Sequence, residues 1–392
     1  MADSYEYLEV AQHIINRDFF IVKNKAISKR PFLYPLFIAI SFTFNPYIII
    51  FLQAILLAIT FILFNKILLS YKIDVKKTYP YIAIIGSPAI LIYSQLVMAE
   101  TLTLFLLTSW FYIFITKNSW QALKYSQFIL VLLIFTKPVF YPFAFLNFIL
   151  LSIYFYRIKR FTFWIVIPLL SVILFIKYNN SKWGYLHFSS IENKNLVHYN
   201  LYYFKSFKES KEKATNWLNE IEKKAQPLNT EEKNKLYKEN AAKEIKDHFF
   251  SYSLYHIMTG FRGIIDPGRF DLMTFTKKED GKQGFLEILN GNKPFSSLFK
   301  QSRDFFIYLL LIPIFIIIVL KWILFIRYFT IKRRPFENYY FLILLIYYVL
   351  ITGPVNCSRY MMPFQLIVTT FALISLEEKV KKNADQNESH CT

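Results

Sequence analysis

Apolar segments of membrane-spanning length recur along this chain, and they limit it to the folds of membrane proteins. At ~1.5 Å rise per residue, about 20 residues cross a hydrocarbon core of ~30 Å. The chain of 392 residues is 55% hydrophobic, and its apolar residues come in blocks. The pattern predicts an all-α polytopic membrane protein. We expect spans at 46–70, 79–94, 97–116, 124–136, 138–156, 161–177, 304–326, 337–352 and 360–376.

Basic residues between these segments indicate how the chain is oriented. The formal net charge is +19, and much of the excess lies in short loops and in the C-terminal tail. Such loops are typical of the cytoplasmic side. Placing them inside makes every span alternate and explains the positive charge without nucleic acid, which we exclude as a partner. The loops assigned inside are 71–78, 117–123, 157–160 and 327–336.

This orientation divides the chain into five parts. A short helix over 5–16 is expected to lie on the surface, and prolines around 31–45 favour an interfacial or re-entrant helix. Alternating Lys and Glu with sparse apolar positions predict amphipathic helices at 206–225 and 230–250. The parts are an outer-face loop with a surface helix (1–30), N-terminal transmembrane helices (31–177), an extracytoplasmic, mainly helical soluble domain (178–303), C-terminal transmembrane helices (304–376) and a cytoplasmic tail (377–392).

The same orientation bears on the N-terminus and on the cysteines. Residues 1–30 fall outside but lack the apolar region of a signal peptide. We therefore expect a signal-anchor helix of ~20 apolar residues to be encoded upstream of Met1. Cys357 and Cys391 are predicted on opposite faces, so no disulfide is expected between them.

Five charged residues lie where spans are expected to meet the outer face: Asp3, Arg30, Glu100, Lys137 and Arg359. Considered one at a time, Asp3 is consistent with a helix N-cap or with a frayed terminus. Each cation is consistent with a residue that anchors the end of a span at the membrane surface. A carboxylate that enters the bilayer is costly and indicates function, and one at the membrane face can act as a general base. Three cations beside two carboxylates favour binding of an anion. A lipid phosphate lies at this depth and suits the planar donors of arginine.

Several other site types find no support. The histidines show no metal-ligand spacing, so neither zinc nor another divalent metal is supported. The sequence contains no glycine-rich phosphate loop and no Gly-x-Ser-x-Gly nucleophile. We expect no cofactor and no direct use of a nucleotide donor.

Short motifs around the charged residues resemble those of GT-C glycosyltransferases. Asp3-Ser4-x-x-Tyr7, followed by Lys29-Arg30-Pro31-x-x-Tyr34-Pro35, is similar to their first outer loop, especially in lipid A aminoarabinose transferases and protein O-mannosyltransferases. Met98-Ala99-Glu100-Thr101 resembles their second acidic position. Where the mannosyltransferases often have an acidic pair, this chain has Asp3-Ser4. Further similar elements are Thr136-Lys137-Pro138, Ser189-Ser190-Ile191, Asn195-Leu196, Tyr199-Asn200 and Ser358-Arg359-Tyr360-x-x-Pro363.

The resemblance covers roughly 1–200 and 350–365 and implies an inverting sugar transfer. The donor would be a polyprenyl-phosphate sugar and the acceptor a hydroxyl of a lipid, glycan or protein, at the outer face of a bacterial cytoplasmic membrane. Asp3 would deprotonate the acceptor, and Glu100 would orient the acceptor or the cations. Phosphate would be held by Arg30, Lys137 and Arg359. Further contacts to donor or acceptor are expected from Tyr7, Tyr34, Arg262 and Arg269.

Two other functions remain open. An O-antigen polymerase or ligase is also polytopic with a large outer loop, would use a pyrophosphate-linked glycan, and would draw on arginines such as Arg262 and Arg269. A transporter or flippase predicts charges at mid-bilayer and repeated halves. Here the singled-out charges lie at the outer mouths of spans, and no repeat is visible.

Overall fold

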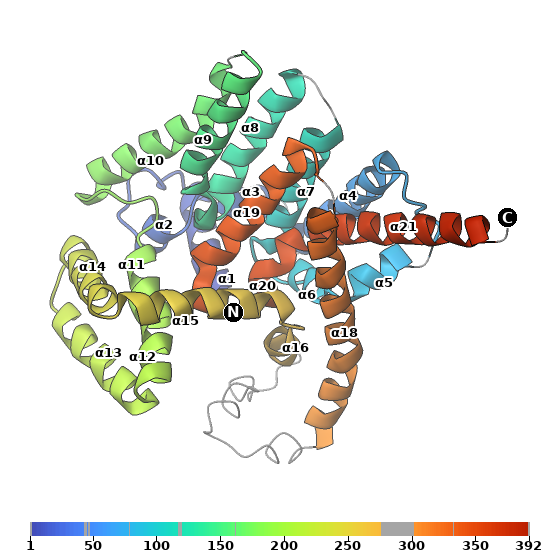
Figure 1. Ribbon diagram of the computed structural model, residues 1–392. Coiled ribbons are helices and arrows are strands. Elements are labelled where there is room, and N and C mark those ends of the chain that lie inside the picture. The colour runs from blue at the N-terminus through green and yellow to red at the C-terminus, as the bar shows by residue number, and fades with distance from the viewer. Residues whose placement is uncertain are drawn as a thin grey trace.

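The computed structural model describes residues 2–42, 45, 48–77, 79–116, 120–160, 162–275, 302–331 and 333–390. Within these ranges the chain folds into helices and turns without a strand (Figure 1), which confirms the all-α fold. Residues 276–301 of the predicted outer domain and Cys391 lie outside the described residues. The predicted division into domains and the assignment of sides remain predictions.

Six of the described helical segments are long and apolar enough to cross a membrane, so the chain is an integral membrane protein. Each matches an apolar segment that the sequence predicts as a span. The first is α4 (Ile48–Ser70), and the second joins η1 (Pro138–Phe140) to α9 (Phe143–Arg157). The others are η2 (Phe163–Val166) with α10 (Ile167–Trp183), α18 (Ser302–Ile331), α19 (Phe336–Thr352) with η7 (Gly353–Val355), and α20 (Ser358–Met361) with η8 (Met362–Phe364) and α21 (Gln365–His390).

The predicted single span at 79–94 is wrong. The chain forms two short helices there, α5 (Tyr79–Ile85) and α6 (Ala89–Ser94), separated at Gly86-Ser87-Pro88. Proline lacks an N–H and disfavours helical backbone in the residue before it, so the helix ends ahead of Pro88. Together α5 and α6 still connect the predicted inner loop 71–78 with the predicted outer turn 94–100.

A buried lysine lies at this break. Lys321, inside α18, donates from Nζ to Ser87 Oγ at 3.1 Å and to Gln365 Oε1 at 2.5 Å. An ionisable side chain inside a span is costly, and hydrogen bonds offset part of that cost. Lys321 thus joins α18, the α5–α6 break and the start of α21. Lys321 is not among the candidate residues predicted from the sequence.

Helix α7 (Glu100–Thr116) lies at the centre of the bundle, between α4 and α8 (Trp120–Thr136). Its Trp110 is fully buried, with ring centroids 5.5 Å from Phe341, 5.7 Å from Tyr340 and 6.1 Å from Phe143. Edge-to-face aromatic pairs of this kind add about 0.5–1.5 kcal/mol each beyond burial. The aromatic core therefore holds the C-terminal half of α7 against α9 and α19.

The described residues 192–275 add further helices, some beside the bundle and some packed against α19 and α6 (Figure 1). The amphipathic helices predicted at 206–225 and 230–250 are confirmed as α13 (Lys211–Ala225) and α14 (Thr230–Asp247). They share a small core of their own with residues such as Phe204, Ile221 and Tyr237. The remaining elements are α11 (Glu192–Asn195), η3 (Leu196–Leu201), α12 (Tyr202–Lys208), α15 (Phe249–Arg262), η4 (Gly263–Ile265) and α16 (Arg269–Phe275).

The N-terminal segment folds against the bundle. Helix α1 (Ala2–Ile15) packs on α3 (Leu33–Phe42) and on α2 (Lys25–Lys29). Its Tyr7, Val10 and Ala11 are buried, so one face of α1 is fixed to the protein. Helix α3 is apolar but has only 10 residues, too few to cross a bilayer, in keeping with the interfacial or re-entrant helix that the prolines predict.

Candidate active site

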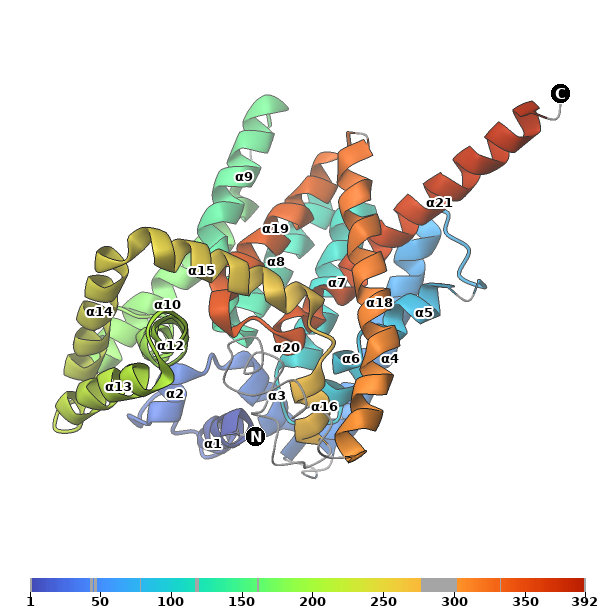
Figure 2. The same ribbon diagram turned by 60° about the horizontal axis from the view of Figure 1, so that its bottom comes forward.

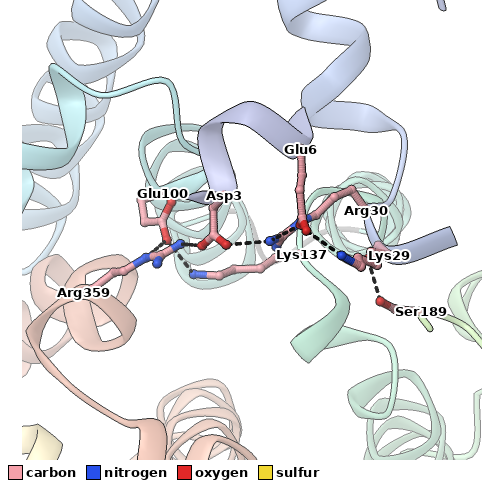
Figure 3. Close-up of polar contacts among 8 residues, drawn as sticks. All are labelled: Asp3, Glu6, Lys29, Arg30, Glu100, Lys137, Ser189 and Arg359. Carbon is pink, nitrogen blue, oxygen red and sulfur yellow. Dashed lines mark hydrogen bonds and ion pairs between the residues drawn. The ribbon is translucent and has the colours of Figure 1, made fainter. Parts of the chain in front are cut away.

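Five charged residues that are far apart in the sequence meet in one network (Figure 3). They come from the starts of α1, α7 and α20 and from the ends of α2 and α8. Because each lies at a helix end, the packing of the bundle positions all five. They are the five candidate residues predicted from the sequence: Asp3, Arg30, Glu100, Lys137 and Arg359.

The Asp3 carboxylate lies between two arginines. Its Oδ1 accepts from Arg30 Nη2 at 2.6 Å and its Oδ2 from Arg359 Nη2 at 2.7 Å. Burial alone would raise the pKa of Asp3, but the two guanidinium groups outweigh it and lower that pKa to about 2. Asp3 is therefore ionised at neutral pH and clamped by two cations.

Glu100 lies deeper than Asp3 and is fully buried. Its Oε1 accepts from Arg359 Nε at 2.5 Å and from Lys137 Nζ at 3.3 Å. Arg359 thus bridges the two carboxylates, with one nitrogen on each. The other oxygen, Oε2, has no hydrogen-bond partner within the described part of the chain. A buried acceptor without a donor is costly, so this oxygen is suited to receive a hydrogen bond from a bound molecule.

Two charged residues that sequence reasoning did not assign extend the network. Glu6 accepts from Arg30 Nε at 2.8 Å and from Lys29 Nζ at 2.6 Å. Ser189 Oγ donates to the Lys29 carbonyl oxygen at 2.6 Å and links the network to the segment after α10 (Figure 3). Glu6 stands one turn after Asp3, so helical spacing within the quoted motif was the signal for it.

Four cations face three carboxylates in the network, which leaves one positive charge in excess. The cations are also placed on aromatic rings: Arg30 lies 4.9 Å from the ring centroid of Tyr7, and Lys137 4.9 Å from that of Tyr360. Such contacts fix the direction of a cation without neutralising it. The arrangement can therefore accept an anion that competes with the carboxylates for the arginines.

The predicted tyrosine contacts lie behind Asp3. Tyr7 is buried, and its ring meets that of Tyr34 edge to face at 4.9 Å. Tyr34 is also buried and donates from its hydroxyl to Gln53 Oε1 at 2.8 Å. The two rings pack α1 against α3, so the structure gives them a packing role, and any contact to donor or acceptor stays a prediction.

Ser358, the residue before Arg359, is held by α16 and by the turn that precedes α16. The Ser358 N–H donates to Asp266 Oδ2 at 2.9 Å, and the Ser358 hydroxyl donates to the buried Asp271. Tyr93 donates to the same Asp271 carboxylate. Burial raises the pKa of Asp271 to about 6, against the opposing effect of these hydrogen bonds. Sequence reasoning missed both aspartates, because their partners are far away along the chain.

The two arginines predicted to contact donor or acceptor lie at the end of α15 and at the start of α16. Arg269 is the first residue of α16, two positions before Asp271. Arg262 is the last residue of α15, where its charge opposes the rise that burial causes in the pKa of Tyr203 and of Tyr255. Neither is among the residues that form the network in Figure 3. Their predicted contact with donor or acceptor remains a prediction.

A further carboxylate lies at the edge of the site. Glu192 accepts from Tyr141 Oη at 2.9 Å and from the Ser189 N–H at 3.1 Å. Burial raises the pKa of Glu192 to about 7, although both hydrogen bonds favour the charged form. The signal for it was its place directly after the quoted Ser189-Ser190-Ile191 element.

This pKa predicts how stability changes with pH. Between the ordinary pKa of 4.5 and about 7, folded Glu192 keeps a proton that the unfolded chain releases. Stability attributable to this group therefore falls as pH rises through that window. In Glu192→Gln the side chain stays neutral at every pH and keeps an acceptor oxygen. The thermal midpoint of the variant minus that of the wild type should therefore rise from about pH 5 to about pH 8.

The measurement is a thermal unfolding series in detergent, with Glu220→Gln as the matched control. Glu220 is exposed on α13, so this variant should follow the wild type at every pH. A Glu192→Gln midpoint that runs parallel to the wild type throughout would show that Glu192 does not titrate in this window.

No group of three or more His, Cys, Asp or Glu side chains is arranged to hold a metal ion among the residues the structure describes. Cys357 is a free cysteine. Comparison with protein-family models, with curated proteins and with solved structures found no match.

Proposed function

We propose that this protein is a membrane glycosyltransferase of the GT-C type, which transfers a sugar with inversion from a polyprenyl-phosphate donor to an acceptor hydroxyl. The observation that carries the proposal is the Asp3 carboxylate held between Arg30 and Arg359, with Glu100 and Lys137 directly behind. A base and a set of cations at the ends of apolar helices suit a substrate with a lipid tail and a phosphate head.

Donor binding and base activation are coupled in this proposal. With a pKa of about 2, Asp3 is a weak base as long as both arginines hold it. A phosphate that takes up the donors of Arg359 or Arg30 weakens this hold and raises the basicity of Asp3. The carboxylate then becomes an effective base only when the donor is in place.

The transfer itself is a single displacement. The acceptor oxygen forms a bond to the anomeric carbon as the bond from that carbon to the phosphate oxygen breaks. The acceptor proton passes to Asp3, and the electron pair of the broken bond stays on the phosphate. Arg30, Lys137 and Arg359 stabilise the charge that develops there, as preorganised donors do in other enzymes. Phosphate is already a good leaving group, so cationic side chains suffice in principle.

Donor class is the property that tests this function. The protein, in lipid nanodiscs, would be given either monosaccharides on polyprenyl monophosphate or oligosaccharides on polyprenyl pyrophosphate. We expect consumption of a monophosphate donor with release of polyprenyl phosphate. Consumption of the pyrophosphate donors alone would replace this proposal by the polymerase or ligase function.

One observation favours a second candidate, a transporter or flippase. Lys321 is a buried lysine well inside a span, a position that often marks a substrate or ion path, and it lies at the break between α5 and α6. Movement of an intact lipid-linked substrate across the bilayer, with no donor consumed, would support this candidate. Broken donor bonds would exclude it as the sole activity.

A further inference from the structure

Helix α15 carries an apolar stripe that is exposed in the structure. Phe250, Leu254, Ile257, Met258 and Phe261 all lie on one side of it, because their spacing follows the helical repeat. Phe250 is 87% exposed and Met258 63%. A continuous apolar surface of this kind marks a place where another apolar phase or partner binds.

The opposite face of α15 is fixed to the outer end of α19. The His256 Nε2 and the Leu350 carbonyl oxygen are 2.7 Å apart. A Cβ on Gly260 would lie 2.9 Å from the Val349 carbonyl oxygen, so glycine is what permits this approach. At Gly353, in left-handed backbone, a Cβ would lie 2.2 Å from the His256 ring. These contacts set α15 at the end of a membrane-spanning helix.

The stripe continues a surface that already faces lipid. Ile346, Leu350 and Ile351 of α19 are exposed on a helix long and apolar enough to cross the membrane. In a bilayer such side chains contact acyl chains. Since α15 is attached beside this surface, its own exposed stripe extends the lipid-facing area outward from α19.

Charge changes sharply where α15 begins. From Phe249 to Phe261 the chain contains no Asp, Glu, Lys or Arg, while the adjoining α14 is densely charged up to Asp247. Aromatic residues are frequent in this stretch, as they are at the boundary between headgroups and acyl chains. In Figure 1 and in Figure 2, α15 runs crosswise to the spanning helix α18. An additional membrane-spanning helix would instead run along α18.

We propose that α15 is a membrane anchor whose exposed stripe inserts among the lipids of the leaflet next to the candidate site. The occupant of this face is lipid, because the stripe is continuous with the lipid-facing part of α19 and carries no charge. Charged helices α13 and α14 then stay in water while α15 holds them beside the bilayer.

Site-directed spin labelling in nanodiscs tests the anchor. In a background with Cys357→Ser and Cys391→Ser, single labels would be placed at Leu254, Met258 and Phe261. We expect each label to collide with oxygen, which concentrates in lipid, far more than with a water-soluble nickel chelate. A label at Lys238, exposed on α14, is the matched control and should show the reverse order. Each variant would first be shown to elute as the wild type does.

Two outcomes would overturn the proposal. Labels on the stripe that favour the nickel chelate would place α15 in water. Labels shielded from both reagents would mean that protein covers the stripe, either a second copy of this chain or another partner. Neither result depends on sugar transfer, so the anchor and the proposed function stand or fall separately.

Discussion

Asp3→Asn should lower turnover of the sugar donor by ~10²-fold or more, the usual size of a general-base contribution. Asparagine has nearly the same shape, and its single amide oxygen can accept from one of the two arginines, but it cannot take a proton from the acceptor. The rate to measure is release of polyprenyl phosphate at saturating donor. Binding of the donor should change much less, because Glu6 still holds Arg30 and Glu100 still holds Arg359.

Asp18→Asn is the matched control for this variant. Asp18 lies after the end of α1 and is paired with His13, and it is not among the residues of the network. The same chemical change there should leave turnover as in the wild type. If Asp3→Asn retained wild-type turnover, Asp3 would not be the base, and Glu100 or Glu192 would have to be tested in its place.

Arg359→Met should be the most destabilising single change in the site. Arg359 is the nearest partner of the fully buried Glu100 and also holds Asp3. Removing one partner of a buried ion pair costs about 3–5 kcal/mol, because the other charge is left buried and poorly compensated. We expect a loss of this size in the free energy of unfolding, measured by steric trapping in bicelles, together with loss of donor turnover.

Two further variants separate the charge effect from the loss of packing. Arg333→Met, the same substitution at an exposed site, should stay within about 0.5 kcal/mol of the wild type. Glu100→Gln should cost less stability in the Arg359→Met background than in the wild type, since the two side chains are direct partners. Losses of stability that simply add in the double variant would show that the two side chains are not coupled, against the pairing described above.

The long spans and the charged network were the features most readily predicted from the sequence. Segment 46–70 is uninterrupted and apolar, so length alone identifies it, and the structure places α4 there. Asp3, Arg30, Glu100, Lys137 and Arg359 stood out because charge at a span end is costly. That they meet in one network could not be derived from spacing, since up to 356 positions separate two contacting residues.

Other features depend on packing that local patterns do not encode. The break at Gly86-Ser87-Pro88 interrupts a segment whose composition is that of a span. Lys321 is tolerated within α18 because Ser87 and Gln365, distant in sequence, accept from it. Helix α15 was not predicted, because one of its faces is apolar and the face that packs on α19 carries polar or small residues. This pattern suits the membrane boundary rather than a soluble domain.

The anomeric configuration of the product tests the central claim most directly. The protein in nanodiscs would be incubated with a polyprenyl-phosphate monosaccharide of known configuration and an acceptor extract, and the glycoside formed would be analysed by NMR. Base-assisted displacement at the network of Asp3, Glu100 and Arg359 predicts the opposite configuration and one polyprenyl phosphate released per glycoside. A product that retains the donor configuration, or no glycoside from any such donor, would contradict the account.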